Sequence, residues 1–479
     1  MQGRLYITMN FASTVQNGCH EGLVTQLASI LPAEGRLSND AASIILHENE
    51  RRVAAGFVRH LTPNSSVFPC CSSPTASSIF LFRICIIVSR IRVVFSIGAL
   101  HGGGSERQIV SALTHLDRQR FEPHLYVIYR DGPLLPMLPD DVPVAAYEER
   151  DRRLATRIPG AMHRRRVADM SRYLQEIDAD VCYDRTFLMT LVAAEAAQQV
   201  QVPNVSTIVT DPSTGFAPVA GRFQWFKKRS LRRLYEHSTA VLAVSSGAAR
   251  SAERFYQLTP GRVFTHYNGV DIKRIRALSE SATLPDWWIA PSAAGRTLVR
   301  LVSAGRLNHE KGFHLLIDAV AQLQKKMPDR EFRLALLGEG GHRDALQQQI
   351  AAHGLTDQIR MPGFQDAAPA WYCTADVYVL SSLVEGMPNT VLEAMACETP
   401  VVASRCPHGP EEILEGGRCG VLCEVNSTVG LEDGVAKLVA DTDLAKQLAK
   451  LALVRIESDF SQPVSQLRLE TALVNAAHP

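Results

Sequence analysis

The sequence predicts an α/β protein built from two doubly wound, Rossmann-like domains with a cleft between them. From residue 91 to residue 455, short apolar runs alternate with amphipathic segments, which is typical of a parallel sheet with helices on both faces. A stretch of small residues and prolines at 280–296 interrupts the alternation and divides it into two series. The chain has 479 residues, which is long enough for two or three domains with substantial cores.

The first series begins at Ile91, where "IRVVFSIGAL" reads as a buried strand bounded by glycines. Helices are expected in "ERQIVSALTHL" and "TLVAAEAAQQV", and further strands in "HLYVIY", "VCYD", "NVSTIVT" and "AVLAVS". We assign 79–285 to this first domain. Residues 1–78 show no sustained period and end in a run rich in Ser, Pro and Cys, so we expect a poorly ordered extension there.

The second series has strands in "LVRLVSAG", "FRLALLG", "VYVLSS" and "PVVAS". We assign 286–455 to the second domain and 456–479 to a helical tail that packs back on the first domain through a few residues.

Two glutamates are the strongest functional signal. Glu385 follows the strand "VYVLSS", and Glu393 lies about a turn and a half into a helix that opens near Pro388. Gly386 and Pro388 suit the intervening turn. The loop at the carboxyl end of a parallel strand faces the ligand crevice, and free N–H groups at the helix start favour an anion. Two carboxylates beside such an anion site suit a ligand that carries sugar, ribose and diphosphate.

A pair of cations lies upstream in "SAGRLNHEKGFHLL". Arg306 follows a strand, Lys311 precedes an amphipathic helix, and Gly312 allows a close backbone approach. Such a pair by itself is more often a solvated surface pair. Because the two-glutamate motif follows in the same sheet, we interpret Arg306 and Lys311 as a diphosphate site.

Glycine-rich turns supply weaker signals. "LHGGGSERQ" follows a strand and predicts a backbone-lined ligand loop at Gly103 and Gly104, with Ser105 capping the next helix. Its spacing is not G-x-G-x-x-G, which argues against NAD binding. Gly338 in "LLGEGG" predicts a tight turn near a base or phosphate. In "HYNGVDI", Asn268 is expected in a structural turn.

The composition limits the classes of molecule that the protein is expected to bind. The formal net charge of +1 predicts no nucleic-acid binding, and no metal-type cysteine spacing appears among ten cysteines, which we expect to be reduced cytosolic thiols. No apolar stretch reaches the roughly 18–20 residues of a spanning helix, and the N-terminus lacks a signal pattern.

Two basic stretches remain ambiguous. Residues 150–172 carry many arginines, and "GRFQWFKKRSLRRLYEH" interleaves Trp225 and Phe226 with basic residues. Contact with an anionic lipid surface and a solvated helix covering the sheet both stay open.

At these residues the chain resembles the retaining glycosyltransferases of family 4, also described as glycosyl transferases group 1, which have the GT-B fold. The resemblance covers roughly 91–455 and is most specific in "GRLNHEKG", "EGMPNTVLEAMACETPVVAS" and "CPHGPEEILEGGRCGVL". It implies a nucleotide-sugar donor in the second domain, an acceptor in the first, and no metal or other cofactor, because Arg and Lys neutralise the diphosphate.

Carried over by position, Arg306, Lys311 and Glu385 are the expected catalytic residues: the cations stabilise the leaving diphosphate, and Glu385 faces the donor hexose. Glu393 would hold the ribose hydroxyls. The remaining donor-binding residues implied are Gly386, Met387, Pro388, Asn389, Thr390, Gly103, Gly104 and Gly338. Glu398 stands where the family usually has glycine, and His408 where a small residue is common; His408 either alters specificity or is a surface histidine.

The resemblance implies transfer of a hexose or N-acetylhexosamine, with retained configuration, from a nucleoside diphosphate sugar, most readily a UDP-sugar. The acceptor class it implies is a lipid-linked or cell-surface glycan. We expect a cytoplasmic location, and the two basic stretches leave open a peripheral contact with the inner face of an anionic membrane. Two alternatives remain: a nucleotide-sugar epimerase of the same architecture, and a non-catalytic sugar-nucleotide binding protein.

Overall fold

The computed structural model describes residues 90–151, 158, 160–292 and 295–478, together with three short strands nearer the N-terminus. These strands, β1 (Leu5–Thr8), β2 (Ser43–Leu46) and β3 (Cys85–Val88), form an antiparallel sheet in the order β2-β1-β3. Two of them fall inside 1–78, the segment that we expect to be a poorly ordered extension. Each is an apolar segment of four residues, too short to show a period. The rest of 1–78 lies outside the described residues.

The first large sheet has the order β10-β9-β8-β7-β4-β5-β6 within the described chain. Pairing is parallel from β10 through β9, β8 and β7 to β4, and β5 pairs in parallel with β6. Its strands are β4 (Ile91–Ile97), β5 (Phe121–Val127), β6 (Val144–Ala146), β7 (Val181–Arg185), β8 (Asn204–Ile208), β9 (Ala240–Ala243) and β10 (Val263–Thr265).

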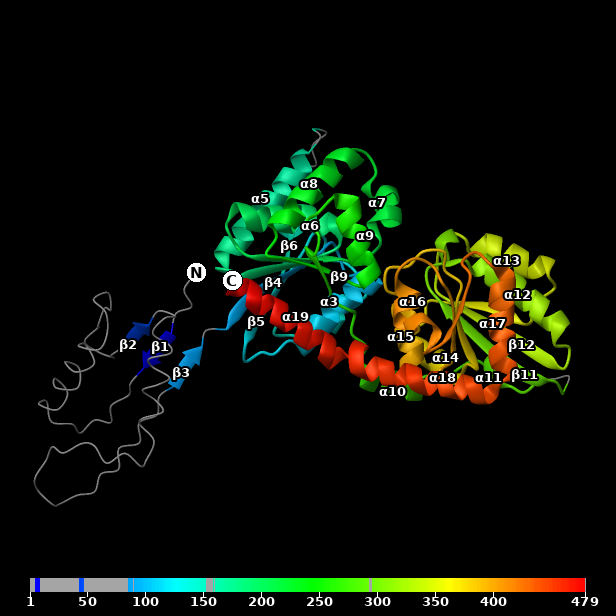
Figure 1. The fold of residues 1–479 in the computed structure, drawn as a ribbon. Helices are drawn as coiled ribbons and strands as arrows, with labels where there is room; N and C mark the ends of the chain where they lie inside the picture. Colours follow the sequence, from blue (N-terminus) through cyan, green and yellow to red (C-terminus); the bar gives the residue numbers. More distant parts are fainter. Residues whose placement is uncertain are drawn as a thin grey trace, which may run out of the picture. The chain divides into compact units, whose positions relative to one another are not determined.

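Helices cover both faces of this sheet. In Figure 1, α5, α6 and α8 lie on one side of it, and α3 and α19 lie on the other. The helices of this part are α3 (Gly104–His115), α4 (Tyr147–Arg150), α5 (Ala161–Glu176), α6 (Phe187–Gln199), α7 (Pro212–Ala220), α8 (Gln224–His237) and α9 (Ser246–Tyr256), with a 3-10 turn at Leu135–Met137. They are followed by α10 (Ile272–Ser281) and α11 (Asp286–Ile289).

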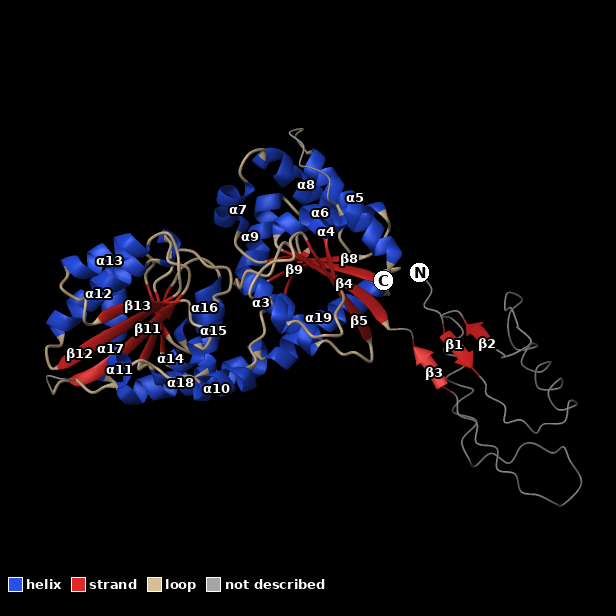
Figure 2. Cartoon of the chain, turned by 180° about the vertical axis from the view of Figure 1, so that it is seen from behind, coloured by secondary structure: helices blue, strands red, loops and turns tan. Residues whose placement is uncertain are grey.

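The second large sheet has the order β13-β12-β11-β14-β15-β16, and every neighbouring pair in it is parallel. Figure 2 shows its strands surrounded by helices. Its strands are β11 (Thr297–Ala304), β12 (Arg330–Leu337), β13 (Ile359–Gly363), β14 (Val377–Leu380), β15 (Val401–Ser404) and β16 (Val421–Cys423). Its helices are α12 (Phe313–Lys326), α13 (Arg343–Ala352), α14 (Ala368–Thr374), α15 (Asn389–Ala396), α16 (Gly409–Ile413) and α17 (Thr428–Ala440), with 3-10 turns at His309–Lys311 and Glu415–Gly417.

Successive side chains of β11 enter two different cores, which shows that the second sheet is covered on both faces. Leu301 packs in a cluster with α12 and α17, whereas Val302 packs in a cluster with α14 and α15. Both side chains are fully buried. A strand buried on both faces reads as a continuous apolar run, which is why it could be recognised in the sequence.

The C-terminal segment runs from the second sheet back to the first. After α18 (Thr442–Arg455) and a π-helical turn (Ile456–Phe460), α19 (Gln462–Ala477) packs against β7, β8 and α3. Strands β6, β13 and β16 were not anticipated, since β6 and β16 have only three residues and β13 contains a proline and ends in glycine. Among the described residues, no helix combines the length and the apolar character needed to span a bilayer.

Candidate functional site

Three loops meet at the carboxyl ends of β11, β12 and β14. Gly338, with φ +134°, follows β12, and a Cβ there would collide with the Gly305 carbonyl oxygen. Gly312, with φ +63°, would likewise collide with the Ser381 carbonyl oxygen. These positions need glycine both for the left-handed backbone and for the close approach. The close approach at Gly338 places the loop after β12 against the backbone that precedes Arg306.

Lys311 and Glu385 form an ion pair in this group of loops. The Lys311 Nζ lies 2.5 Å from the Glu385 Oε1, and the side chains are 22% and 9% exposed. The Ser382 hydroxyl donates a second hydrogen bond to the same carboxylate oxygen over 2.7 Å. The structure therefore brings two predicted site residues into direct contact and adds Ser382, which the sequence analysis did not single out. Arg306 lies at the same edge of the sheet with an exposed side chain.

Glu393 is a partly buried carboxyl group on α15. Burial raises its pKa to about 7, while the charges of Arg107 and Arg274 and a hydrogen bond from the Tyr372 hydroxyl oppose the rise. A carboxyl group whose pKa is raised to near 7 by burial is a recurrent feature of functional sites. Arg107 and Tyr372 were not predicted, because their partner is remote in the sequence.

The start of α15 lies between the two glutamates. Pro388 precedes the first helical residue, and its carbonyl oxygen accepts from the Val391 and Leu392 N–H groups. The N–H groups of Asn389 and Thr390, the first two helical residues, are the ones that suit an anion. The Met387 side chain is buried in the hydrophobic core, so only its backbone suits a ligand. Thr390 Oγ1 accepts a hydrogen bond from the Tyr378 hydroxyl over 2.6 Å. Gly386 has no room for a side chain, since a Cβ would lie 2.6 Å from the Val209 carbonyl oxygen.

The glycine-rich loop of the first sheet lies beside this helix start. A Cβ on Gly104 would approach the Asn389 Nδ2 within 3.0 Å. The helix that follows begins at Gly104, with Gly103 preceding it, so the expectation that Ser105 caps it was wrong. A Cβ on Gly103 would meet the Glu106 carboxylate at 2.5 Å.

Asn268 takes part in a hydrogen-bond chain rather than only in a turn. Its Nδ2 donates to the Asn389 Oδ1 over 2.7 Å, and its Oδ1 accepts from an Arg185 Nη at 2.5 Å. Asn268 and Arg185 are both buried. The chain fixes the amide of Asn389, so that its orientation depends on a residue of β7.

His408 is not a surface histidine, which corrects one of our two interpretations of it. Its Nε2 lies 3.1 Å from the Asp211 Oδ2, and the two side chains are only 19% and 3% exposed. The backbone of His408 has φ +83°, a conformation that non-glycine residues rarely adopt. Four residues later, the Glu412 carboxylate accepts hydrogen bonds from the Ser246 backbone N–H, the Ser246 hydroxyl and the Tyr267 hydroxyl.

Glu398, the second departure from the family pattern, lies in a backbone conformation that is unusual for a residue other than glycine. It follows the C-cap of α15 with φ +57°, a left-handed conformation that favours glycine. The family's customary glycine and the observed backbone therefore agree.

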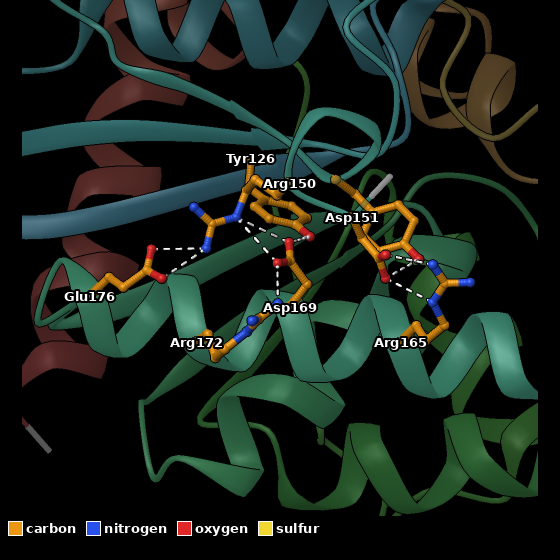
Figure 3. A network of polar contacts seen from close by, with 8 residues as sticks. Tyr126, Arg150, Asp151, Arg165, Asp169, Arg172 and Glu176 are labelled. Atoms are coloured by element: carbon orange, nitrogen blue, oxygen red, sulfur yellow. Dashed lines mark hydrogen bonds and ion pairs between the residues drawn. The ribbon is translucent and has the colours of Figure 1, made fainter. Parts of the chain in front are cut away.

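Ion pairs neutralise much of the first basic stretch. Figure 3 shows this network, and its arginine–carboxylate pairs are Arg150–Asp169, Arg150–Glu176, Arg172–Asp169 and Arg165–Asp151. The fully buried Asp169 also accepts a hydrogen bond from Tyr126 over 2.8 Å. These arginines hold α5 to its neighbours. Residues 152–157 and 159 of the stretch lie outside the described residues.

The second basic stretch carries an exposed apolar patch. We define the α7–α8 patch as Val219, Phe223, Trp225 and Phe226, whose side chains are 56–66% exposed. Six basic residues lie in or beside it, and no acidic residue occurs from Pro212 to Tyr235. The basic residues are Arg222, Lys227, Lys228, Arg229, Arg232 and Arg233.

Two protein-family models match the chain. The model described as Glycosyltransferase Family 4 matches residues 102–274, and the model described as Glycosyl transferases group 1 matches residues 290–453. The chain belongs to glycosyltransferase family 4. The second match contains both glutamates, Arg306 and Lys311, and the first contains Gly103 and Gly104.

Curated members of this family share part of the chain. The lipopolysaccharide core biosynthesis glycosyltransferase LpsE of Rhizobium meliloti is 33% identical over 162 residues, which are 34% of this chain and 46% of LpsE. The putative colanic acid biosynthesis glycosyltransferase WcaL of Escherichia coli is 33% identical over 192 residues, covering 38% and 47%. The chain thus spans about half the length of these curated relatives.

Solved structures share the fold of this chain. Anabaena Alr3699/HepE in complex with UDP-glucose superposes with a TM-score of 0.65 at 21% identity, covering 81% of this chain and 100% of that one. This likeness and the two parallel sheets confirm the predicted GT-B architecture.

Proposed function

We propose that this family 4 protein is a retaining glycosyltransferase that moves a hexose or N-acetylhexosamine from a nucleoside diphosphate sugar to a lipid-linked or cell-surface glycan. The observation that carries this proposal is the grouping of Arg306, the Lys311–Glu385 pair and Glu393 at one edge of the second sheet. The grouping supplies cations for a diphosphate, a carboxylate for a sugar and a second carboxylate for a ribose.

In the proposed reaction, the bond between the sugar C1 and the diphosphate oxygen breaks, and its electron pair leaves with the nucleoside diphosphate. The charges of Arg306 and Lys311 stabilise this leaving group better than they stabilise the intact donor, which is the condition for acceleration. The oxygen of the attacking acceptor hydroxyl forms the new bond to C1, and its proton passes to the departing diphosphate or to solvent. We propose that the two cations take the place of a metal ion at the diphosphate, so that no cofactor is needed.

We propose a UDP-sugar as the donor. The support is indirect: a structural neighbour, Alr3699/HepE, is described in complex with UDP-glucose. Within this chain, the carboxyl group of Glu393 on α15 has a pKa of about 7. Its ionised form can accept two hydrogen bonds, which suits a pair of ribose hydroxyls.

A lipid-linked acceptor is supported by the α7–α8 patch. Exposed aromatic side chains bordered by Lys and Arg can enter the headgroup region of an anionic membrane. We therefore propose that the enzyme works in the cytoplasm, in contact with the inner face of the membrane. The names of LpsE and WcaL, which refer to lipopolysaccharide and colanic acid biosynthesis, agree with such an acceptor class.

The test is a thermal-shift screen with UDP, GDP and ADP and then their sugars, on the wild type and on Glu393→Ala. A ligand at one hundred times its Kd should stabilise the protein by about 2.7 kcal/mol. We expect a shift with one nucleotide that is lost in the variant. No shift with any nucleotide would refute the donor site.

Turnover then separates the alternatives. An epimerase would convert the bound sugar nucleotide without an acceptor. A non-catalytic protein would bind it and leave it unchanged in the presence of lipid-linked acceptors. The proposed enzyme should release the nucleoside diphosphate only when an acceptor is glycosylated or when water replaces it.

A further inference from the structure

Two cysteines, Cys373 and Cys397, lie near each other, and the charge of Glu393 acts on the second of them. Cys373 is on α14, and Cys397 is the residue that ends α15. The Cys397 Sγ lies 3.8 Å from the Pro369 carbonyl oxygen, and Pro369 is one helical turn before Cys373 on the same face of α14. The two thiols interact, and each one shifts the pKa of the other.

The surroundings make the two thiols unequal. The Cys397 thiol, the Ser279 hydroxyl and the charge of Arg276 on α10 lower the pKa of Cys373 to about 7, against the effect of partial burial. The same contact and burial raise the pKa of Cys397. Cys373 is also exposed, whereas Cys397 is partly buried. Near pH 7, a substantial fraction of Cys373 is therefore a thiolate open to solvent, with a protonated thiol next to it.

The other four cysteines whose side chains the structure describes lack this combination. They are fully or largely buried, and burial raises the pKa of each of them: Cys182, Cys406, Cys419 and Cys423. Buried thiols with raised pKa values are unreactive.

We propose that Cys373 and Cys397 form a reversible disulfide under hydroperoxide, and that this disulfide weakens donor binding at Glu393. The second half rests on the proposed function. In the first step the Cys373 thiolate attacks the terminal oxygen of the peroxide. An S–O bond forms, the O–O bond breaks, and hydroxide or alkoxide leaves and takes a proton from solvent.

In the second step the Cys397 sulfur attacks the Cys373 sulfur. The S–S bond forms, the S–O bond breaks, and the departing hydroxide takes the Cys397 proton and leaves as water. The two sulfurs together lose two electrons, and the peroxide oxygen gains them. Two equivalents of a small thiol reverse the change by exchange.

The link to the donor site is short. The neighbour of Cys373, Tyr372, donates the hydrogen bond to the Glu393 carboxylate. On the other side, the Cys397 N–H donates to the Glu393 carbonyl oxygen over 3.1 Å. Closing the thiols to the disulfide length of about 2.05 Å moves the end of α14 against the end of α15. Both of these elements hold Glu393, so its carboxyl group is displaced relative to a bound ribose.

Peptide mapping on the full chain tests the disulfide itself. Both cysteines fall in one tryptic peptide, 361–405, because no Lys or Arg lies between them. After limited hydrogen peroxide treatment and blocking of free thiols, this peptide should be lighter by two hydrogen atoms than the reduced, unblocked form. A protease that cuts after glutamate separates the two cysteines unless they are joined, since Glu385 and Glu393 lie between them.

The linked peptide should vanish in Cys373→Ser and in Cys397→Ser and return to the reduced mass with dithiothreitol. Recovery of two separately blocked cysteines, or of a sulfinic acid at Cys373 without a link, would overturn the proposal. The Cys423→Ala variant is the control and should form the linked peptide as the wild type does.

Titration with UDP tests the effect on binding. The Kd should rise several-fold on oxidation of the wild type, recover with dithiothreitol, and stay constant in Cys373→Ser. An unchanged Kd in a fully linked protein would overturn the regulatory half while leaving the proposed function intact. Failure of the reduced wild type to bind UDP or another nucleotide would count against the proposed function and would leave the peptide mapping to decide the disulfide.

Discussion

The Lys311 Nζ lies 2.5 Å from the Glu385 Oε1, although the two residues come from different loops of the second sheet. The contact joins the cation expected at the diphosphate to the carboxylate expected at the hexose. It also means that each side chain is held in place by the other, with Ser382 as a second donor to Glu385. A site ordered before the ligand arrives loses less conformational freedom on binding.

Replacing Lys311 with alanine should reduce turnover and stability together. Loss of the cation at the leaving group should lower kcat by about 10²–10³-fold. The Glu385 carboxylate would keep only Ser382 as a partner at 9% exposure, and such a loss typically costs about 1–3 kcal/mol. Steady-state kinetics and denaturant unfolding measure the two effects.

Lys326→Ala, which breaks an exposed pair far along α12, is the control and should leave turnover unchanged. Wild-type turnover in Lys311→Ala would remove this residue from the mechanism.

Arg306→Ala should lower turnover without lowering stability. The Arg306 side chain is exposed, so its loss should leave the melting temperature unchanged while kcat falls by about 10²–10³-fold. The matched control is Lys325→Ala, another exposed cation of the second part of the chain. Activity within a few-fold of the wild type would show that Arg306 is only a surface charge, which was the simpler interpretation of its sequence.

Donor affinity should increase as the pH rises from about 6 to about 8. Burial raises the pKa of Glu393 to about 7, and its ionised form accepts hydrogen bonds from ribose hydroxyls. Binding therefore releases a proton, and Kd should fall across this range and then level off. Isothermal titration with UDP in two buffers of different ionisation enthalpy measures both effects. Glu393→Gln, which cannot ionise, should show weaker binding with a flat pH profile; a pH-dependent Kd in that variant would assign the titration to another group.

The ionisation of Glu393 should also affect stability. Donor affinity rises with pH, whereas the free energy of unfolding should fall. The pKa of Glu393 is higher in the folded protein than the ordinary value of 4.5, so its favourable contribution is present below pH 4.5 and is lost as the pH rises to about 7. At about 1.4 kcal/mol for each pKa unit, the change is at most about 3 kcal/mol. The difference in unfolding free energy between the wild type and Glu393→Gln, followed from pH 5 to pH 8, should show it. A constant difference would contradict the raised pKa.

Much of this site could be predicted from the sequence because its parts are local. Glu385 and Glu393 belong to one strand–loop–helix unit, whose buried strand, proline and helix are visible in a single stretch. The Lys311–Glu385 contact could not be found in this way, since 74 residues separate the partners. The parallel pairing of β11 with β14 and hydrogen bonds between the two loops bring them together. His408 and Asp211 are still farther apart in the chain. The short strands β6 and β16 were missed because three residues are too few to show a period.

Glu398→Gly should stabilise the protein. Glu398 has φ +57° at the end of α15, and glycine adopts this conformation without the steric cost of a Cβ. We expect a gain of about 0.5–1 kcal/mol in the free energy of unfolding, measured with urea. Glu398→Ala is the control, because it removes the same carboxylate but keeps the strain, and it should bring no gain. Equal stabilisation by both changes would assign the effect to the charge.

The α7–α8 patch should bind anionic membranes through two separable contributions. Trp225 and Phe226 pack edge to face with centroids 4.9 Å apart and are 66% and 62% exposed, so they form one apolar unit that can enter the headgroup region. Changing both to aspartate removes the apolar area and adds repulsion, and vesicle affinity should fall by about tenfold or more.

The matched control for the patch is Leu467→Asp, which places an acid at a side chain of similar exposure, 62%, on α19. Sedimentation with vesicles of phosphatidylcholine containing phosphatidylserine measures the binding. The basic residues beside the patch contribute about 1 kcal/mol each near an anionic surface, so binding should weaken strongly between low and physiological salt and be lost on vesicles of phosphatidylcholine alone. Equal losses in the patch variant and in Leu467→Asp would show that added negative charge, rather than this patch, governs the interaction. Salt-independent binding would contradict the electrostatic part and leave an apolar contact that does not distinguish anionic lipid.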